Sequence, residues 1–345
     1  MAKVVFITQQ VDPMHPALAA TVPKIAALAS VVDEVVVLAD GVVENVLPSN
    51  CRWRTFGSAT KAGRGLRFEA AVAQELRGLR GGAVVAHMCP IYAVLAAPLV
   101  RPLRVPLVLW FTHWRGSRLL RAAEHASTAV TSVDTRSFPF ESSKVRAIGH
   151  GIDLSEFPCA ERQATIGELR LLALGRYSPA KGLDVVLHAV ASVDESVRLE
   201  ICGPALSAEE RSHRQELERL VVKLRLEKRV NLADAVPRAA VPGLLAEHDA
   251  LINNMRAGAP DKVVYEAAAS CLPVLASNPV FDSLLDAAQV FQREDSGELA
   301  ERIRALASLT PAERAALGRR LREQVELHHS VQSWARGILE AAGIA

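Results

Sequence analysis

Leu171-Leu-Ala-Leu-Gly-Arg-Tyr-Ser-Pro-Ala-Lys-Gly-Leu-Asp184 joins a short apolar run to a turn rich in Gly and Pro. The run predicts a buried β-strand, and the turn predicts a tight connection to a helix. Arg176 and Lys181 closely follow the strand end. Free amides at a helix N-terminus favour an anion, and Arg with Lys suits a diphosphate. The plainer alternative is two surface cations on an ordinary loop.

Similar apolar runs recur along the chain and alternate with Ala- and Leu-rich helical stretches. They lack apolar/polar alternation, as strands do when helices cover both faces of a parallel sheet. This alternation of strands and helices predicts a doubly wound α/β fold with parallel sheets. The expected strands are Val4–Thr8, Val35–Ala39, Ala83–Ala86, Val105–Phe111, Thr128–Ser132, Val145–Ile148, Arg170–Leu174, Val197–Cys202, Arg229–Leu232, Ala250–Asn253, Pro273–Ala276 and Ala288–Phe291.

The strand and helix pattern occurs twice in 345 residues, which favours two domains. The polar stretch from Phe157 to Glu168 reads as the break between them. We therefore expect a first domain at 1–157, a linker at 158–168 and a second domain at 169–325. A helical segment at 326–345 would then be able to pack back on the first domain.

The bulk composition excludes several classes of protein. A net charge of +2 gives no reason to expect a nucleic-acid partner. No apolar stretch is long enough for a membrane span, and the N-terminal run is too short for a signal peptide. Five scattered cysteines without a CxxC pair predict free thiols in a reducing cytoplasm.

Basic residues gather in the first half of the chain. The simpler interpretation is that these side chains form an ordinary solvated surface. The more specific interpretation is that they bind an anionic acceptor or make peripheral contact with the inner membrane face. The two groups are Arg52, Arg54, Lys61, Arg64 and Arg67, and Arg101, Arg104, Arg115, Arg118 and Arg121.

A second motif runs from Asn253 to Ala276, with a strand end, a Gly and Pro loop, a helix and another strand. Asp261 suits the helix N-cap. Glu266 lies in a mostly apolar helix, where a charged side chain is costly unless it has a binding partner. Its carboxylate can accept hydrogen bonds from ribose hydroxyls, whereas the plain alternative is an exposed helical Glu.

Strand exits of the first half supply further candidates, because ligands bind at the carboxyl ends of strands in such sheets. His87 follows one strand and His113 follows another. Gln10 and Asp12 lie in the loop after the first strand and suit hydroxyl groups. We expect His113, Gln10 and Asp12 to contact an acceptor.

These motifs together resemble the retaining glycosyltransferases of family 4, which have the GT-B fold of two Rossmann-like domains facing a cleft. "GRYSPAKG" is similar to the phosphate motif of that family, and "KVVYEAAASCLPVLAS" to its Glu-containing segment. "IGHGIDLSEF" at Ile148–Phe157 and "LEICGP" at Leu199–Pro204 resemble two further family stretches. The resemblance covers about residues 83–280, and the order and spacing of the motifs carry it.

The resemblance implies a role for each matching residue. Arg176 and Lys181 would hold the donor diphosphate and stabilise the leaving group, without a metal or other cofactor. Glu266 would bind the donor ribose. Pro260, Lys262 and Glu266 fit the Pro-x-Lys-x-x-x-Glu form of some family members, so Lys262 would also face the phosphates, and Asp261 would take over contacts with the donor sugar. His87 would lie next to the transferring sugar as a catalytic group. Family members usually have a second Glu where this chain has Gly258, which puts that contact with the sugar in doubt.

We therefore expect an enzyme: a glycosyltransferase that moves a sugar from a nucleotide-diphosphate-sugar to an acceptor hydroxyl with retention of configuration. The acceptor could be a small molecule, a glycan or a lipid-linked molecule. Alternatives are a nucleotide-sugar-binding protein without transferase activity and an epimerase or phosphorylase of the same fold. A nicotinamide oxidoreductase is disfavoured because no Gly-x-Gly-x-x-Gly follows the first strand.

Overall fold

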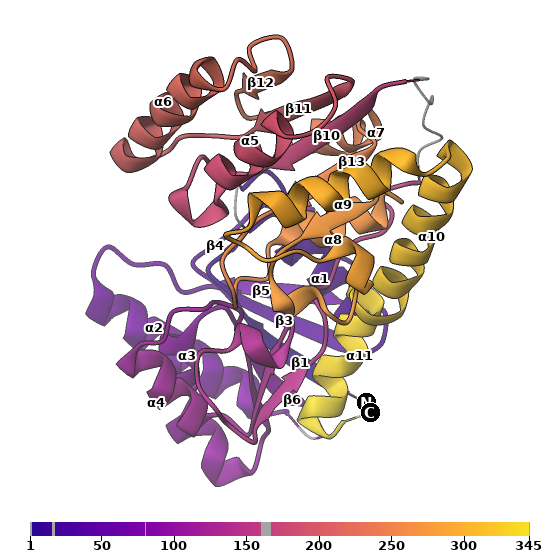
Figure 1. Cartoon of the computed structure of the whole chain (residues 1–345). Coiled ribbons are helices and arrows are strands. Elements are labelled where there is room, and N and C mark those ends of the chain that lie inside the picture. The colour runs from indigo at the N-terminus through magenta and orange to yellow at the C-terminus, as the bar shows by residue number, and fades with distance from the viewer. Residues whose placement is uncertain (1, 16–17, 80, 160–166, 345) are drawn as a thin grey trace. The chain divides into compact units, whose positions relative to one another are not determined.

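The computed structural model describes residues 2–15, 18–79, 81–159 and 167–344. The chain divides into two compact units (Figure 1). Unit 1 comprises residues 1–153 and 328–345, and unit 2 comprises residues 154–327. Seven of the eleven residues of the expected linker, 160–166, lie outside the described residues.

Unit 1 is built on a parallel sheet of seven strands in the order β5-β3-β1-β6-β7-β8-β9. Helices α2, α3 and α4 pack on one face, where their apolar side chains share a core with the strands. Helices α1 and α11 contact each other, and α11 also contacts β7 and β8. The elements are β1 (Lys3–Ile7), β2 (Gln10–Val11), α1 (Thr21–Ala29), β3 (Glu34–Ala39), β4 (Gly41–Val42), β5 (Cys51–Thr55), α2 (Lys61–Leu76), β6 (Ala83–His87), α3 (Pro90–Val100), η1 (Arg101–Leu103), β7 (Leu107–Trp110), α4 (Arg118–Ala126), β8 (Ala129–Ser132), η2 (Thr135–Ser137), β9 (Val145–Ala147) and α11 (Val331–Ala342).

Unit 2 contains a parallel sheet of five strands in the order β12-β11-β10-β13-β14. An apolar core of this unit joins β10 and β11 to helices α5, α6 and α9. The elements are β10 (Leu169–Leu174), η3 (Pro179–Lys181), α5 (Leu183–Ala191), β11 (Val197–Cys202), α6 (Ala208–Lys223), β12 (Val230–Ala233), η4 (Arg238–Ala240), α7 (Val241–Ala246), β13 (Ala250–Asn253), α8 (Lys262–Ala269), β14 (Val274–Ala276), η5 (Pro279–Phe281), η6 (Ala287–Gln289), α9 (Ser296–Ser308) and α10 (Pro311–His328).

The predicted doubly wound α/β fold is confirmed, with two corrections in detail. The expected strand Ala288–Phe291 is wrong, because a 3-10 turn occupies Ala287–Gln289 and only Val290 forms a single bridge, to Ala276. The buried Gln289 side chain donates to a backbone carbonyl of β14 and holds this turn. Strand β5 was missed because it lies at the sheet edge, where exposed Arg and Trp side chains break the apolar pattern.

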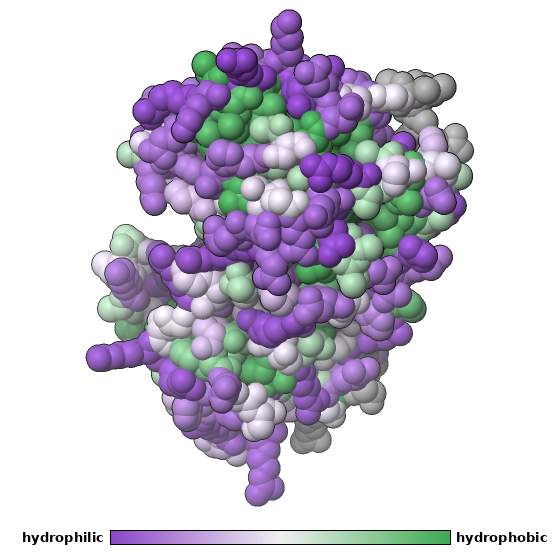
Figure 2. All heavy atoms as spheres, viewed as in Figure 1, coloured by the Kyte–Doolittle hydropathy of each residue, from purple (hydrophilic) through white to green (hydrophobic). Residues whose placement is uncertain are grey.

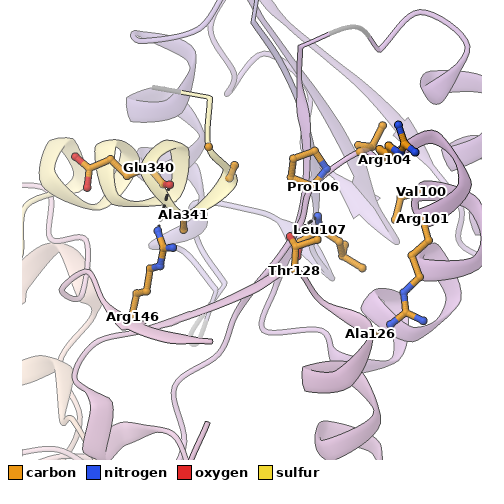
Figure 3. Close-up of a pocket in the computed structure, with 13 residues that line it drawn as sticks. Val100, Arg101, Arg104, Pro106, Leu107, Ala126, Thr128, Arg146, Glu340 and Ala341 are labelled. Atoms are coloured by element: carbon orange, nitrogen blue, oxygen red, sulfur yellow. Dashed lines mark hydrogen bonds between the residues drawn. The ribbon is translucent and has the colours of Figure 1, made fainter. Parts of the chain in front are cut away.

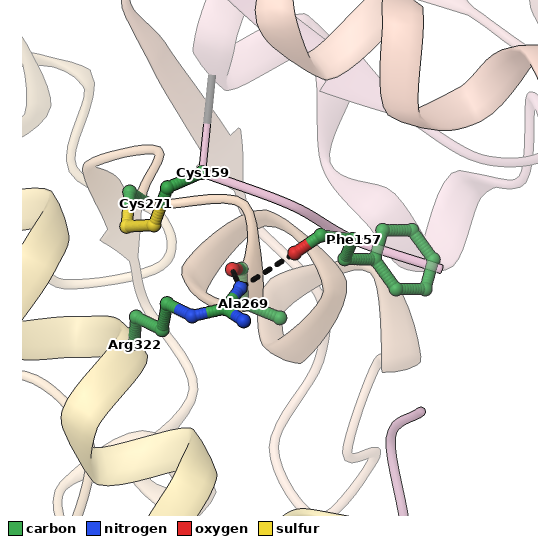
Figure 4. Close-up of a disulfide and its surroundings, with 5 residues drawn as sticks. All are labelled: Phe157, Cys159, Ala269, Cys271 and Arg322. Carbon is green, nitrogen blue, oxygen red and sulfur yellow. Dashed lines mark hydrogen bonds between the residues drawn. A yellow bond between two sulfur atoms is a disulfide. The ribbon is translucent and has the colours of Figure 1, made fainter. Parts of the chain in front are cut away.

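A disulfide joins Cys159 to Cys271, so the expectation of free thiols throughout is wrong (Figure 4). The fold brings residues 112 positions apart to a Cα separation of 5.1 Å, which suits the bond. Arg322 of α10 also joins these segments by donating to the carbonyl oxygens of Phe157 and Ala269. The argument from thiols for a reducing compartment therefore fails. The free thiols are those of Cys51, Cys89 and Cys202.

The first basic group of unit 1 is largely paired. Arg52 and Arg54 bond the buried Glu75 carboxylate, and Lys3 lies 3.1 Å from it. Burial alone would raise the pKa of Glu75, but these hydrogen bonds lower it to about 2. Arg64 pairs with Asp40 at 3.2 Å. Three of the five residues of this group, Arg52, Arg54 and Arg64, are therefore paired with carboxylates of unit 1.

The visible surface is mostly hydrophilic, with apolar residues in small separate groups (Figure 2). Among the described residues, no helix is both long and apolar enough to cross a bilayer.

Candidate functional site

Lys181 of unit 2 is held at the exit of strand β10. Its ammonium donates to the carbonyl oxygen of Leu174 at 2.8 Å and to the Asp261 carboxylate at 2.5 Å. A Cβ at Gly175 would lie only 2.4 Å from the Lys181 Nζ, so glycine leaves the space that the ammonium fills. Asn253, at the end of β13, also donates to Asp261 at 2.8 Å. The structure thus brings two separate sequence motifs together around one cation.

The loop that carries Lys181 is held against the ends of the neighbouring strands. The buried Tyr177 hydroxyl lies 2.8 and 2.9 Å from the carbonyl oxygens of Ile201 and Ala233, and its one proton is shared between these two acceptors. A Cβ at Gly203 would lie 2.1 Å from the Gly175 carbonyl oxygen, so the next strand exit must also be glycine. These contacts hold the loop close to the sheet and restrict where Lys181 can lie.

Arg176 is placed differently from Lys181. Its guanidinium lies 3.1 Å from the Glu210 carboxylate, and its side chain is 60% exposed. Glu210 belongs to a capping box with Ser207 at the start of α6. Arg176 is therefore tied loosely to α6, whereas the 12% exposed Lys181 is tied closely to the strand exit.

Glu266 lies on α8 and is nearly buried, with its side chain 7% exposed. It accepts from Lys262 at 2.8 Å and from Arg238 at 2.6 Å. Arg238 also reaches Glu156 at 2.7 Å, and its guanidinium lies 5.4 Å from the Phe157 ring. Burial by itself would lower the pKa of Arg238, but the two carboxylates raise it above its ordinary value.

Gly258 stands where the family that the sequence resembles usually has a second Glu, and its φ of +78° favours glycine. Its N–H donates to Asn278 Oδ1 at 3.2 Å, and the Asn278 amide donates to the carbonyls of Arg256 and Ala259 at 2.8 Å each. The buried Asn278 therefore holds this loop in shape. A carboxylate at position 258 is replaced by a tightly bonded backbone turn.

Each cation expected to bind phosphate already has a carboxylate partner: Arg176 with Glu210, Lys181 with Asp261, and Lys262 with Glu266. An arriving diphosphate would have to share or replace these partners. Among the described residues, no group of three or more His, Cys, Asp or Glu side chains is placed to hold a metal ion.

Arg238 and Asn278 were missed by sequence reasoning. Each follows a strand closely, Arg238 after β12 and Asn278 after β14. The strand-exit rule that selected Lys181 could have selected both.

His87 of unit 1 lies inside the domain. Its side chain packs among the rings of Phe6, Trp110 and Trp334, at centroid distances of 5.4, 5.8 and 6.2 Å. It is 5% exposed, and neither ring nitrogen has a hydrogen-bond partner among the described residues. Burial, and then the charge of Lys24, lower its pKa well below the ordinary value, so the ring is neutral at pH 7.

His113 lies on the exposed loop that follows β7. Its Nδ1 accepts from the Arg115 N–H at 2.9 Å, and its ring stacks on Trp114 at 5.6 Å. Burial, and then Arg115, lower its pKa. This ring is accessible, in contrast to that of His87.

Gln10 and Asp12 belong to the loop after β1. Gln10 forms β2, and its amide packs over Gly41, where a Cβ would lie 2.7 Å from the amide oxygen. Asp12 accepts from the Met14 N–H at 2.8 Å and closes a local turn. Both side chains are half-buried and take part in the local structure of this loop.

Comparison with known proteins extends this picture. Residues 161–324 match the family model described as "Glycosyl transferases group 1". No curated protein matches the sequence. The structure is similar to that of HepE from Anabaena in complex with UDP, with 19% identity, a TM-score of 0.77, and coverage of 99% of this chain and 100% of that chain.

Two other solved structures share the whole fold. Sucrose-phosphate synthase from Thermosynechococcus elongatus is 15% identical with a TM-score of 0.72, and a glycosyltransferase from Rickettsia africae is 12% identical with a TM-score of 0.75. Each comparison covers 99% of this chain and 98% of the other. The chain therefore has the GT-B fold of these glycosyltransferases throughout, and its residues 161–324 match the group 1 glycosyl transferase family.

Proposed function

We propose that this protein is a retaining glycosyltransferase that uses a nucleotide-diphosphate-sugar donor and needs no metal ion. One observation carries the proposal: Lys181 lies at the β10 exit, over a glycine that leaves room for it, inside the segment that matches group 1 glycosyl transferases. HepE has been crystallised with UDP and with UDP-glucose, so UDP-sugars are the first donors to test.

In the proposed reaction, the bond between the sugar and the diphosphate breaks as the acceptor oxygen attacks the anomeric carbon. Lys181 and Arg176 offset the charge that develops on the leaving diphosphate, which is the role usually given to positioned cations. The diphosphate accepts the proton of the acceptor hydroxyl, so no nucleophilic carboxylate is needed. The protein contributes position and electrostatic stabilisation.

Glu266 is the proposed ligand of the donor ribose hydroxyls. Its nearly buried carboxylate has a second oxygen besides the one that Lys262 and Arg238 contact. Arg238 acts as a positioning residue, because its guanidinium bonds both the Glu266 carboxylate of α8 and the Glu156 carboxylate, and so fixes the direction of Glu266. In place of the missing carboxylate at position 258, the backbone turn and Asp261 are the proposed contacts of the donor sugar.

His113 is better placed than His87 to reach a substrate from unit 1, because it is exposed. His87 would need the packing of Phe6, Trp110 and Trp334 to open before a sugar hydroxyl could approach. We therefore propose His113 for the contact with sugar or acceptor and a packing role for His87. His113→Ala should lower kcat/KM strongly with little loss of stability. An unchanged kcat/KM in His113→Ala would contradict this proposal and would favour His87 as the residue beside the sugar.

A nucleotide-sugar-binding protein without activity is the second candidate, favoured by Gly258 in place of a sugar-binding carboxylate. Donor hydrolysis or sugar transfer by the purified protein separates the two. Transfer to any acceptor supports the enzyme, whereas tight donor binding without turnover across a broad acceptor panel supports the binding protein.

The donor site is tested by thermal shift with UDP, GDP, ADP and dTDP, each with and without EDTA. A ligand at 100 times its Kd stabilises a protein by about 2.7 kcal/mol, which is readily seen. We expect one nucleotide to stabilise the protein equally with EDTA. Loss of the shift in EDTA would refute metal independence, and no shift with any nucleotide would refute the donor site.

A further inference from the structure

Unit 1 contains a pocket of about 410 Å³ at the edge of its sheet where β7 and β8 begin (Figure 3). Pro106, Leu107 and Thr128 form its floor, between the end of α11 on one side and the end of α3 on the other. Its size is in the range of small-molecule sites. His87 and His113 lie at the carboxyl ends of their strands, whereas the pocket lies at the amino ends of β7 and β8. The pocket is therefore separate from the proposed reaction site.

Three arginines line this pocket: Arg101, Arg104 and Arg146. Arg101 donates to the His125 carbonyl oxygen at 2.8 Å, and Arg146 donates to the Glu340 carbonyl oxygen at 3.3 Å. Within the described parts of the chain, none of the three guanidinium groups forms an ion pair.

The acidic side chain in the lining does not neutralise these arginines. Glu340 contributes its carbonyl oxygen to Arg146, but its carboxylate points away from the pocket (Figure 3). The positive charge of the pocket is therefore not neutralised, whereas the arginines beside Glu75 are paired with its carboxylate.

The rest of the lining is apolar. Val100 and Leu107 are buried, and the helix ends contribute small side chains that leave the space open. The remaining apolar lining residues are Val105, Pro106, Ala126, Ala341 and Ala342. An apolar wall beside three cations fits a ligand that has an apolar body and a negatively charged end.

We propose that this pocket binds an amphiphilic phosphate monoester. Guanidinium groups bind phosphate oxygens by paired hydrogen bonds, and three of them suit a group with more than one negative charge. The apolar body would lie against the walls formed by the ends of α3, α4 and α11. The phosphate could belong to a free metabolite or to the headgroup of a lipid.

Arg104 provides a sharp test because its backbone is left-handed, with a φ of +55°. Glycine adopts this conformation more readily than arginine, so Arg104→Gly removes a charge without straining the fold. Arg225 has a φ of +57° and is exposed in unit 2, so Arg225→Gly is a matched control.

The experiment is calorimetric titration of the full chain with octyl phosphate below its micellar concentration. It is done in the presence of saturating UDP, or of whichever nucleotide the thermal shift selects. Wild type and Arg225→Gly should bind it equally, Arg104→Gly at least about fivefold more weakly, and inorganic phosphate and octanol should both bind more weakly than octyl phosphate. Equal binding by Arg104→Gly and wild type, or equal binding of octanol and octyl phosphate, would overturn the proposal.

Sedimentation with phosphatidylcholine vesicles that contain phosphatidic acid distinguishes the two sources. Cosedimentation of wild type but not of Arg104→Gly identifies a lipid headgroup. Octyl phosphate binding that depends on Arg104, without cosedimentation, identifies a free phosphate monoester. Binding in neither assay overturns the proposal.

Discussion

Replacing Lys181 with Met should weaken nucleotide-diphosphate binding far more than replacing Arg176 with Met. Lys181 is 12% exposed and is held at the strand exit, whereas Arg176 is 60% exposed on the α6 side. A hydrogen bond to a charged group in a shielded site contributes about 1.5–3 kcal/mol, which corresponds to a roughly 10- to 150-fold change in Kd. An exposed ion pair contributes at most about 1 kcal/mol, or roughly fivefold.

The stability of the variant must be separated from its affinity. Lys181→Met leaves Asp261 without its cation, although Asn253 still donates to it at 2.8 Å. We expect the free energy of unfolding to fall by about 1–2 kcal/mol. The double variant Lys181→Met/Asp261→Asn should recover this stability, because no unpaired carboxylate remains, and should still bind the nucleotide weakly.

The assay is calorimetric titration with UDP in EDTA, or with whichever nucleotide the thermal shift selects. Arg198→Met is the control, because Arg198 pairs with Glu168 at 3.0 Å near the beginning of β11, at the opposite edge of the sheet. It should bind like wild type. A Kd for Lys181→Met within threefold of wild type would refute the assignment of the phosphate site to Lys181 at the β10 exit. A larger loss of affinity in Arg176→Met would refute the argument that the shielded Lys181 contributes more than the exposed Arg176.

Gly175→Ala should abolish nucleotide binding, because its Cβ would lie 2.4 Å from the Lys181 ammonium and its φ of +127° disfavours alanine; unchanged affinity in titration would contradict this. Cys159→Ser should lower the free energy of unfolding in urea by up to about 5 kcal/mol, because the bond closes a loop of 112 residues, whereas Cys51→Ser should not. Burial, and then His328, lower the pKa of His329 to about 4. The unfolded ring titrates near 6.5, so its stabilising contribution is complete above about pH 6.5 and falls by about 3 kcal/mol as the pH drops to 4; His329→Gln should flatten this slope.

The doubly wound fold was predictable because its signal is local. A strand that helices cover on both faces must be apolar throughout, so β1, β3 and β10 are visible as apolar runs. Strand β5 was not predicted because it forms through contacts with residues distant in sequence. It pairs with β3 at the sheet edge, and its Arg52 bonds to Glu75. The false strand at Ala288–Phe291 shows the converse. A 3-10 turn that one side-chain hydrogen bond holds occupies the start of this segment, and only Val290 bridges to the sheet.

Most members of the candidate site were predictable, apart from Arg238 and Asn278, but their pairings were not. The strand exit selected Lys181, and the helix of the second motif selected Asp261 and Glu266. The structure places Lys181 and Asp261 in one ion pair. It ties Arg176 to Glu210 instead, and it makes Arg238 a partner of Glu266. Such pairings depend on which loops meet at a sheet edge, and the order of strands sets that.

By itself, the sequence determined the repeated strand and helix pattern, the positions of the turns, and the motif that matches group 1 glycosyl transferases. Only the tertiary structure decided that Cys159 meets Cys271, that His87 is buried while His113 is exposed, and that Arg101, Arg104 and Arg146 share a pocket. Periodicity and turn chemistry act between neighbours in the chain, so they can be read locally. Burial and charge pairing act between segments that are far apart until the fold brings them together.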